Sequence, residues 1–155
     1  MSLAAHGITV ELPDGWDGRI YRLAGGAPIL HAASFALPAS DGDFGSSATG
    51  VMPDGGAFFA LKEYVPDRRL HPGRGLFAAR ALRAPLDARR FHPRALQVGR
   101  RGQAGMQHFF TAGERPFCLY AVISTIRAQA HAASVPGRLD ELNQVVSSLA
   151  IGARQ

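Results

Sequence analysis

Three apolar runs in the second half of the chain, joined by short turns that contain glycine, constrain the fold more than any other feature. The runs span residues 96–101, 103–111 and 117–125, with Gly102 in the first turn and Gly113 in the second. Such connections are typical of β-hairpins, because glycine adopts the positive backbone angles that a tight turn requires. The sequence therefore predicts an antiparallel meander here.

Further strands are expected in the first half of the chain. Residues 8–12 and 19–23 alternate apolar and polar side chains, which indicates strands with one buried face, and the turn at 13–15 between them favours a hairpin. The longer apolar run at 28–37 suits a strand covered on both faces. Residues 57–64, bounded by glycines and a proline, predict one more strand.

One helix is expected near the end of the chain. Residues 139–149 carry leucine and valine at helical spacing, which predicts an amphipathic helix with one face on the sheet. Residues 76–83 favour two helical turns, whereas residues 38–56 are interpreted as a loop with room for a short strand at 48–52. The predicted fold class is α+β, an antiparallel β-sheet with a C-terminal helix packed on it.

The composition fits one folded domain over residues 1–155. A hydrophobic fraction of 46% with 19% charged residues supplies a core and excludes wholesale disorder. No apolar run is long enough for a transmembrane helix, and the first residues lack the regions of a signal peptide, so we expect a cytoplasmic protein. The single cysteine, Cys118, cannot form a disulfide within the chain.

The positive charge is concentrated in one segment. The formal net charge is +5, yet residues 1–64 carry seven acids against three basic groups. Residues 65–101, which we call the arginine segment, carry ten arginines against Asp67 and Asp87, a local net charge of +8. Four prolines place much of it in surface loops or short helical turns. The segment is either a solvated loop or a surface that binds an anionic or acidic partner.

Nucleic acid is a less favoured partner for the arginine segment. Nucleic-acid binding usually adds exposed aromatic side chains that stack on bases. Phe77 and Phe91 are the only aromatic residues of the segment, and both are expected to anchor it on the core.

Two classes of function remain open. The first is a non-enzymatic accessory or interaction domain that binds a protein or anionic partner with the arginine segment and the adjoining strand edge. The candidate binding residues are Arg89, Arg90, Arg100 and Arg101. The alternative is a small-molecule-binding protein or enzyme with a pocket between sheet and helices. The candidate pocket residues are His31, His108, Arg115 and Tyr120. A homodimer through an open sheet edge is compatible with both.

No motif for catalysis, metal binding or cofactor binding is recognisable, so no cofactor is expected and an enzyme is the less favoured reading. The six histidines lack the spacing of three or four residues that metal sites use. Cys118 lies in an apolar run and is expected to be an inert core thiol. A tight turn near Gly113 nevertheless places it opposite His108, Phe109 or Phe110, and a cysteine beside a histidine is an activated nucleophile.

Both ends of the chain resemble the PsbP-like domains. Many members open with an amphipathic strand that runs into a Pro-x-x-Trp turn, as Pro13-Asp14-Gly15-Trp16 does here, and end with a helix patterned like residues 139–149. Residues 105–110 and 115–120 are similar to strands of small uncharacterised bacterial proteins. The resemblance implies a three-layer α/β/α sandwich and a role in binding rather than catalysis. It implies no site residues.

Overall fold

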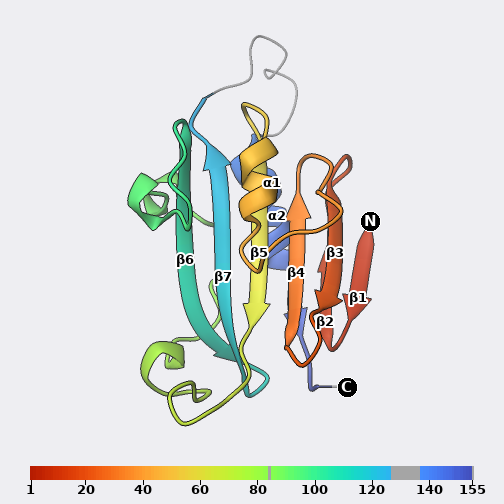
Figure 1. Ribbon diagram of the computed structural model, residues 1–155, viewed down its shortest axis with the longest axis vertical. Helices are drawn as coiled ribbons and strands as arrows, with labels where there is room; N and C mark the ends of the chain where they lie inside the picture. The colour runs from red at the N-terminus through yellow and green to blue at the C-terminus, as the bar shows by residue number, and fades with distance from the viewer. Residues whose placement is uncertain (84, 127–136, 155) are drawn as a thin grey trace.

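The computed structural model describes residues 1–83, 85–126 and 137–154 of the chain. Its centre is a five-stranded antiparallel sheet (Figure 1). In spatial order the strands are β3 (Asp17–Arg22), β4 (Pro28–Ala33), β5 (Ala57–Glu63), β7 (Arg115–Ser124) and β6 (Gln103–Ala112). All residues of β4 are buried, as the apolar run at 28–37 predicted for a strand covered on both faces.

β6 and β7 form the predicted hairpin. Their two-residue turn, Gly113 and Glu114, has positive φ at both positions (57° and 60°), the conformation that short hairpin turns favour. In the ladder Phe109 lies opposite Cys118, and His108 lies opposite Leu119. This register lies within the range predicted from the turn.

Residues 96–101, predicted as the first strand of the meander, do not form a strand. The Gln97 backbone N–H donates to the Tyr120 hydroxyl (2.9 Å), and Leu96 packs against the side chains on that face of the sheet. The segment therefore lies on a face of the sheet instead of extending the ladder.

A second antiparallel sheet has three strands, in the order β1 (Ser2–Ala5), β2 (Ile8–Glu11) and β8 (Ala150–Ile151). The predicted hairpin between residues 8–12 and 19–23 is wrong, because β2 pairs with β1 and β8 while β3 pairs with β4. His6 and Gly7 have positive φ and turn the chain just before β2. Alternation predicts which face of a strand is buried and carries no information about its partner.

α1 (Ser46–Val51) packs on one face of the five-stranded sheet, which we call the α1 face (Figure 1). There Ala48 packs with Phe58 and Tyr120. This helix corrects the interpretation of residues 38–56 as loop with a short strand. The Asp41 carboxylate accepts hydrogen bonds from the backbone N–H groups of Ser47 and Ala48 (2.9 and 2.8 Å). The acid precedes the helix by more than the usual capping distance, so the sequence shows no capping motif.

α2 (Arg138–Ser148) packs on the opposite face, the α2 face, as the leucine and valine spacing predicted. Its buried residues Leu142, Val145 and Val146 join the main core cluster, which also contains residues of β2, β5 and β7. Trp16 donates from Nε1 to the Glu141 carboxylate (3.0 Å) and so ties the turn before β3 to the helix. The fold is α+β, with helical elements on both faces of an antiparallel sheet.

The arginine segment contains three short 3₁₀ turns, η1 (Gly75–Phe77), η2 (Ala88–Arg90) and η3 (Pro93–Ala95). The two helical turns predicted for residues 76–83 are not formed beyond η1. The Thr111 N–H donates to the Ala79 carbonyl (3.0 Å), and Arg80 forms a parallel bridge with Thr111. These contacts hold residues 79–80 in an extended conformation along the β6 edge. A helix there could not make them, because its backbone groups would bond within the helix.

Candidate functional site

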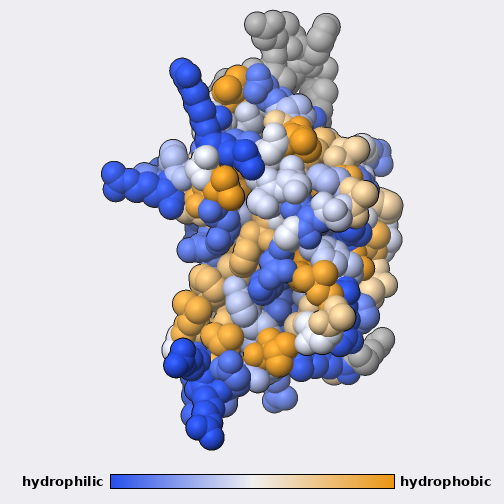
Figure 2. All heavy atoms as spheres, viewed as in Figure 1, coloured by the Kyte–Doolittle hydropathy of each residue, from blue (hydrophilic) through white to orange (hydrophobic). Residues whose placement is uncertain are grey.

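The arginine segment presents nine exposed arginines along the β6 side of the molecule, and we call these nine residues the arginine surface. They are Arg68, Arg69, Arg74, Arg80, Arg83, Arg89, Arg90, Arg94 and Arg101. Figure 2 shows hydrophilic side chains projecting from the side of the molecule that carries the green segment in Figure 1. Across the ranges that the structure describes, one ion pair involves this surface, between Arg89 and Asp87 (2.9 Å).

The two acidic residues of the arginine segment already accept hydrogen bonds from neighbouring residues of that segment. The Asp67 carboxylate accepts from the backbone N–H groups of Arg69 and Leu70, and these hydrogen bonds lower its pKa. Hydrogen bonds from the side chain and backbone of Arg89 likewise lower the pKa of Asp87. Both acids are therefore ionised at neutral pH, and the surface keeps a large excess of positive charge.

The arginine segment is anchored on the sheet at several points. Phe77 is fully buried against Tyr64 and Phe109, and Phe91 is buried in the main core cluster. His92 exchanges two backbone hydrogen bonds with Gly105 at the β6 edge (2.8 and 3.1 Å). The arginine surface therefore rests on a backbone fixed by buried side chains and by bridges to β6.

The structure separates the four predicted partner-binding arginines into two groups. Arg89, Arg90 and Arg101 are exposed and belong to the arginine surface. Arg100 is half-buried, its Nη2 donates to the Ser46 carbonyl (3.0 Å), and its Nε is buried without a hydrogen-bond partner among the described residues. Arg100 thus ties the end of the arginine segment to α1.

The four predicted pocket residues do not share a pocket, because side chains alternate along each strand. His31 and Tyr120 lie on the α1 face. There His31 contacts the ring of Phe58, and Tyr120 belongs to the same core cluster as Phe58. His108 stacks on Phe110, and Arg115 lies over Phe117, two core residues on the α2 face. The sheet itself lies between the two pairs.

Arg115 is occupied by internal contacts. Its side chain is 2% exposed and pairs with the buried carboxylate of Glu63. Its remaining donors reach the backbone carbonyls of Gly152 (3.0 Å) and His6 (2.9 Å). Arg115 therefore joins β7 and β5 to the turn before β2 and to the C-terminal residues, and its donors are not available to a ligand.

His108 and Cys118 do not form a catalytic pair. His108 donates from Nε2 to the Arg80 carbonyl (2.8 Å) on the α2 face. Cys118 precedes Leu119 in β7, so its side chain projects to the opposite face of the sheet, the α1 face. There it is fully buried. Burial raises the pKa of the Cys118 thiol to about 12, so the nucleophilic thiolate is not populated at neutral pH.

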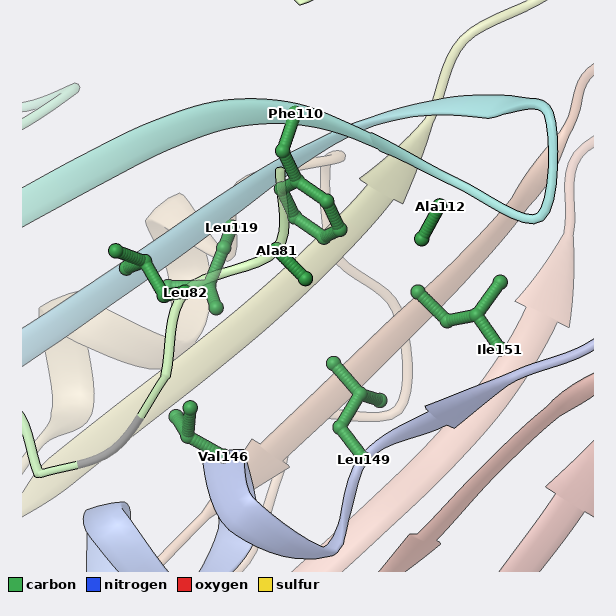
Figure 3. Close-up of a pocket in the computed structure, with 8 residues that line it drawn as sticks. All are labelled: Ala81, Leu82, Phe110, Ala112, Leu119, Val146, Leu149 and Ile151. Carbon is green, nitrogen blue, oxygen red and sulfur yellow. The ribbon is translucent and has the colours of Figure 1, made fainter. Parts of the chain in front are cut away.

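A small apolar cavity lies between the sheet and α2 (Figure 3). Its volume is about 120 Å³, and Phe110 of β6, Leu119 of β7 and Val146 of α2 point into it. Every residue that lines it has an apolar side chain, so no side chain there could orient a polar substrate.

A larger cavity, of about 250 Å³, opens on the α1 face beside β3 and β4. Of the four predicted pocket residues, His31 lines it. Arg19, Tyr21 and Asp41 also line it, and sequence reasoning missed all three. The alternation of residues 19–23 set Arg19 and Tyr21 on one face, but their position beside His31 depends on the pairing of β3 with β4, which the sequence did not show.

The described parts of the chain hold no cluster of three or more histidine, cysteine, aspartate or glutamate side chains that could bind a metal ion. Among the helices that the structure describes, none is long and apolar enough to cross a membrane. No family model, curated protein or solved structure matches the chain.

Proposed function

We propose that the protein is an interaction domain that binds an acidic surface of a partner protein through the end of the arginine surface that carries Arg89, Arg90 and Arg101. The observation that carries this proposal is the exposure of nine arginines on one anchored segment with a single internal ion pair. Clustered like charges repel one another in the free protein, and a partner that supplies carboxylates relieves that repulsion.

The anchoring of the segment favours a binding surface over a solvated loop. Phe77 and Phe91 hold the segment on the core at two points, and bridges at Arg80 and at His92 attach it to β6 after each of them. A pre-organised surface loses less conformational entropy on binding than a flexible one. The arginines near η2 are therefore presented at nearly fixed positions.

A protein partner is favoured over nucleic acid. The two aromatic side chains of the segment, Phe77 and Phe91, are both buried, as their interpretation as anchors predicted. They are therefore not available to stack on unpaired bases, which is a common contribution to the binding of single-stranded nucleic acid.

The experiment is capture of the partner from native lysate by the tagged chain of residues 1–155, at low and high salt and with nuclease treatment in parallel. We expect a discrete protein that is retained after nuclease treatment and lost at high salt, because salt screens contacts between exposed charges. The variant Arg89→Gln/Arg90→Gln/Arg101→Gln is expected to lose that protein.

The matched control is Arg68→Gln/Arg69→Gln/Arg74→Gln, which removes the same charge from the other end of the arginine surface. If both triple variants lose the partner equally, net charge explains the capture and a defined docking surface near η2 is excluded. A partner that disappears with nuclease would identify nucleic acid as the ligand instead.

Two further expectations belong to the same proposal. The PsbP-like resemblance of the two ends of the sequence also favours a role in binding. We also propose a cytoplasmic location, as expected in the sequence analysis.

A further inference from the structure

A second candidate site lies near β3, at the opposite edge of the five-stranded sheet from the arginine surface. It is the cavity of about 250 Å³ between β3, β4 and the loop that leads to α1. Its lining residues are Arg19, Tyr21, Leu23, His31, Leu37, Pro38, Ala39, Ser40 and Asp41. It combines apolar walls with a few polar groups, which is the usual composition of a small-molecule site.

Tyr21 supplies a hydrogen-bond donor to this cavity. Burial raises the pKa of Tyr21 to about 12, helped by the charges of Asp43 and Asp41, so the phenol keeps its proton at neutral pH. His31 is its nearest polar neighbour, with Nε2 3.5 Å from the hydroxyl. That nitrogen donates to the Asp43 carbonyl (2.8 Å) and therefore has no lone pair to accept the Tyr21 proton. The hydroxyl proton is left for another acceptor.

Arg19 supplies a cation. Its Nη1 and Nη2 donate to the carbonyls of Ala39 (3.0 Å) and Leu37 (3.5 Å), which fixes the guanidinium against the loop. A guanidinium has five N–H donors, so three are left after these two contacts. Among the described residues no carboxylate forms an ion pair with Arg19. Asp17, on the same face of β3, accepts instead from the Leu37 backbone N–H (2.8 Å).

Asp41 and Asp43, which flank the cavity, already bind other groups of the protein. The Asp41 carboxylate accepts from the backbone N–H groups of Gly42, Ser47 and Ala48. Asp43 forms an ion pair with Lys62. These acids therefore use their oxygens in contacts within the protein, whereas Arg19 keeps N–H donors for a ligand.

The size of the cavity sets the size of the apolar part of a ligand. A dry cavity of about 150 Å³ holds a benzene molecule, and this one is larger and also open to solvent. Leu23, Leu37 and Pro38 offer apolar contacts to such a ring.

We propose that this cavity binds a small monocarboxylate with an apolar body the size of one aromatic ring. The carboxylate lies against the Arg19 guanidinium and the Tyr21 hydroxyl, and the ring lies against the three apolar side chains. The proposal is independent of the arginine surface, because Arg19 and Tyr21 lie on the strand farthest from β6.

The test is titration of the isotopically labelled full-length chain with benzoate, followed through backbone amide resonances. We expect saturable shifts confined to β3, β4 and the loop at 37–43, with millimolar affinity or better. Tyr21→Phe removes one hydroxyl and is expected to weaken binding about tenfold, whereas Arg19→Gln is expected to weaken it about 10- to 100-fold, as loss of a charged hydrogen bond does.

The matched control variant is Arg22→Gln, which removes the same charge from an exposed position on the same strand and should leave the affinity unchanged. The control ligand is benzyl alcohol, which has the ring without the charge and should bind at least tenfold more weakly. Equal binding of the two ligands, an equal loss in Arg22→Gln, an unchanged affinity in Tyr21→Phe, or no saturable shift with benzoate would each overturn the proposal. Because Tyr21→Phe leaves the loop contacts of Arg19 in place, it separates loss of binding from loss of folding.

Discussion

Arg115 and Glu63 form a bidentate ion pair on the α2 face of the sheet. The distance from Nε to Oε1 is 3.0 Å, and that from Nη2 to Oε2 is 2.6 Å. Both side chains are almost fully buried. Arg154 reaches the same carboxylate from the C-terminal residues (2.7 Å) with a side chain that is 52% exposed. The sheet, the turn before β2 and the chain end therefore converge on one charged cluster.

Removal of the Glu63 charge should destabilise the protein strongly. Glu63→Gln leaves the Arg115 guanidinium buried without its counterion, which costs about 3–5 kcal/mol of unfolding free energy. Chemical denaturation measures the loss. Arg154→Gln removes the exposed partner of the same carboxylate and should cost less than about 1 kcal/mol. Similar losses in the two variants would contradict the structural role of the buried pair.

Gly45 is required at the start of α1. Its φ is 68°, and a Cβ at this position would overlap the ring of Phe58. Gly45→Ala should therefore lower the unfolding free energy by about 2–4 kcal/mol, from backbone strain and overpacking together. Gly42→Ala is the matched control, since the Cβ that it adds would have nothing within 4 Å. A thermal melt of each variant would show whether only Gly45 is constrained.

Stability should fall below neutral pH because of His31. Burial lowers the pKa of His31 from its ordinary value of 6.5, and the hydrogen bond to Asp43 only partly offsets this. The unfolded chain then binds a proton that the folded chain does not, so the contribution is fully present above pH 6.5 and is lost as the pH falls from there. One such group contributes a slope of at most about 1.4 kcal/mol per pH unit.

The measurement is the unfolding free energy of the wild type between pH 7 and pH 5, compared with variants at two histidines. His31→Gln should flatten the pH dependence, and the exposed His71→Gln should not. An unchanged slope in His31→Gln would show that folding does not lower the pKa of His31.

Cys118 should react with thiol reagents only after unfolding. Its side chain is fully buried, and with a pKa of about 12 only about one thiol in ten thousand is ionised at pH 8. A thiol-labelling time course in buffer and in denaturant tests this. Ser47→Cys in Cys118→Ser places a thiol on an exposed residue of α1 and should label at once in buffer. Rapid labelling of native Cys118 would show that the α1 face opens.

Elements set by neighbouring residues were predicted from the sequence. The β6–β7 hairpin, and its register to within one residue, follow from Gly113 and the two apolar runs beside it. The helix α2 follows from the spacing of its own leucines and valines. The arginine segment was visible as a charge pattern, and its anchors Phe77 and Phe91 were the only aromatic residues it contains. These features depend on residues that are close together in the sequence, so the sequence alone is enough to predict them.

Tertiary structure decided the strand pairings outside the β6–β7 hairpin and what depends on them. The alternation in β2 and β3 fits several partners, and only the packed molecule places β2 beside β8 and Tyr21 beside His31. Side-chain alternation then set His31 and Arg115 on opposite faces of the sheet and brought Arg115 to Glu63, 52 residues away in the chain. Such long-range contacts form because burial of apolar strands forces charged groups to find partners inside the core, and residue spacing does not record that choice.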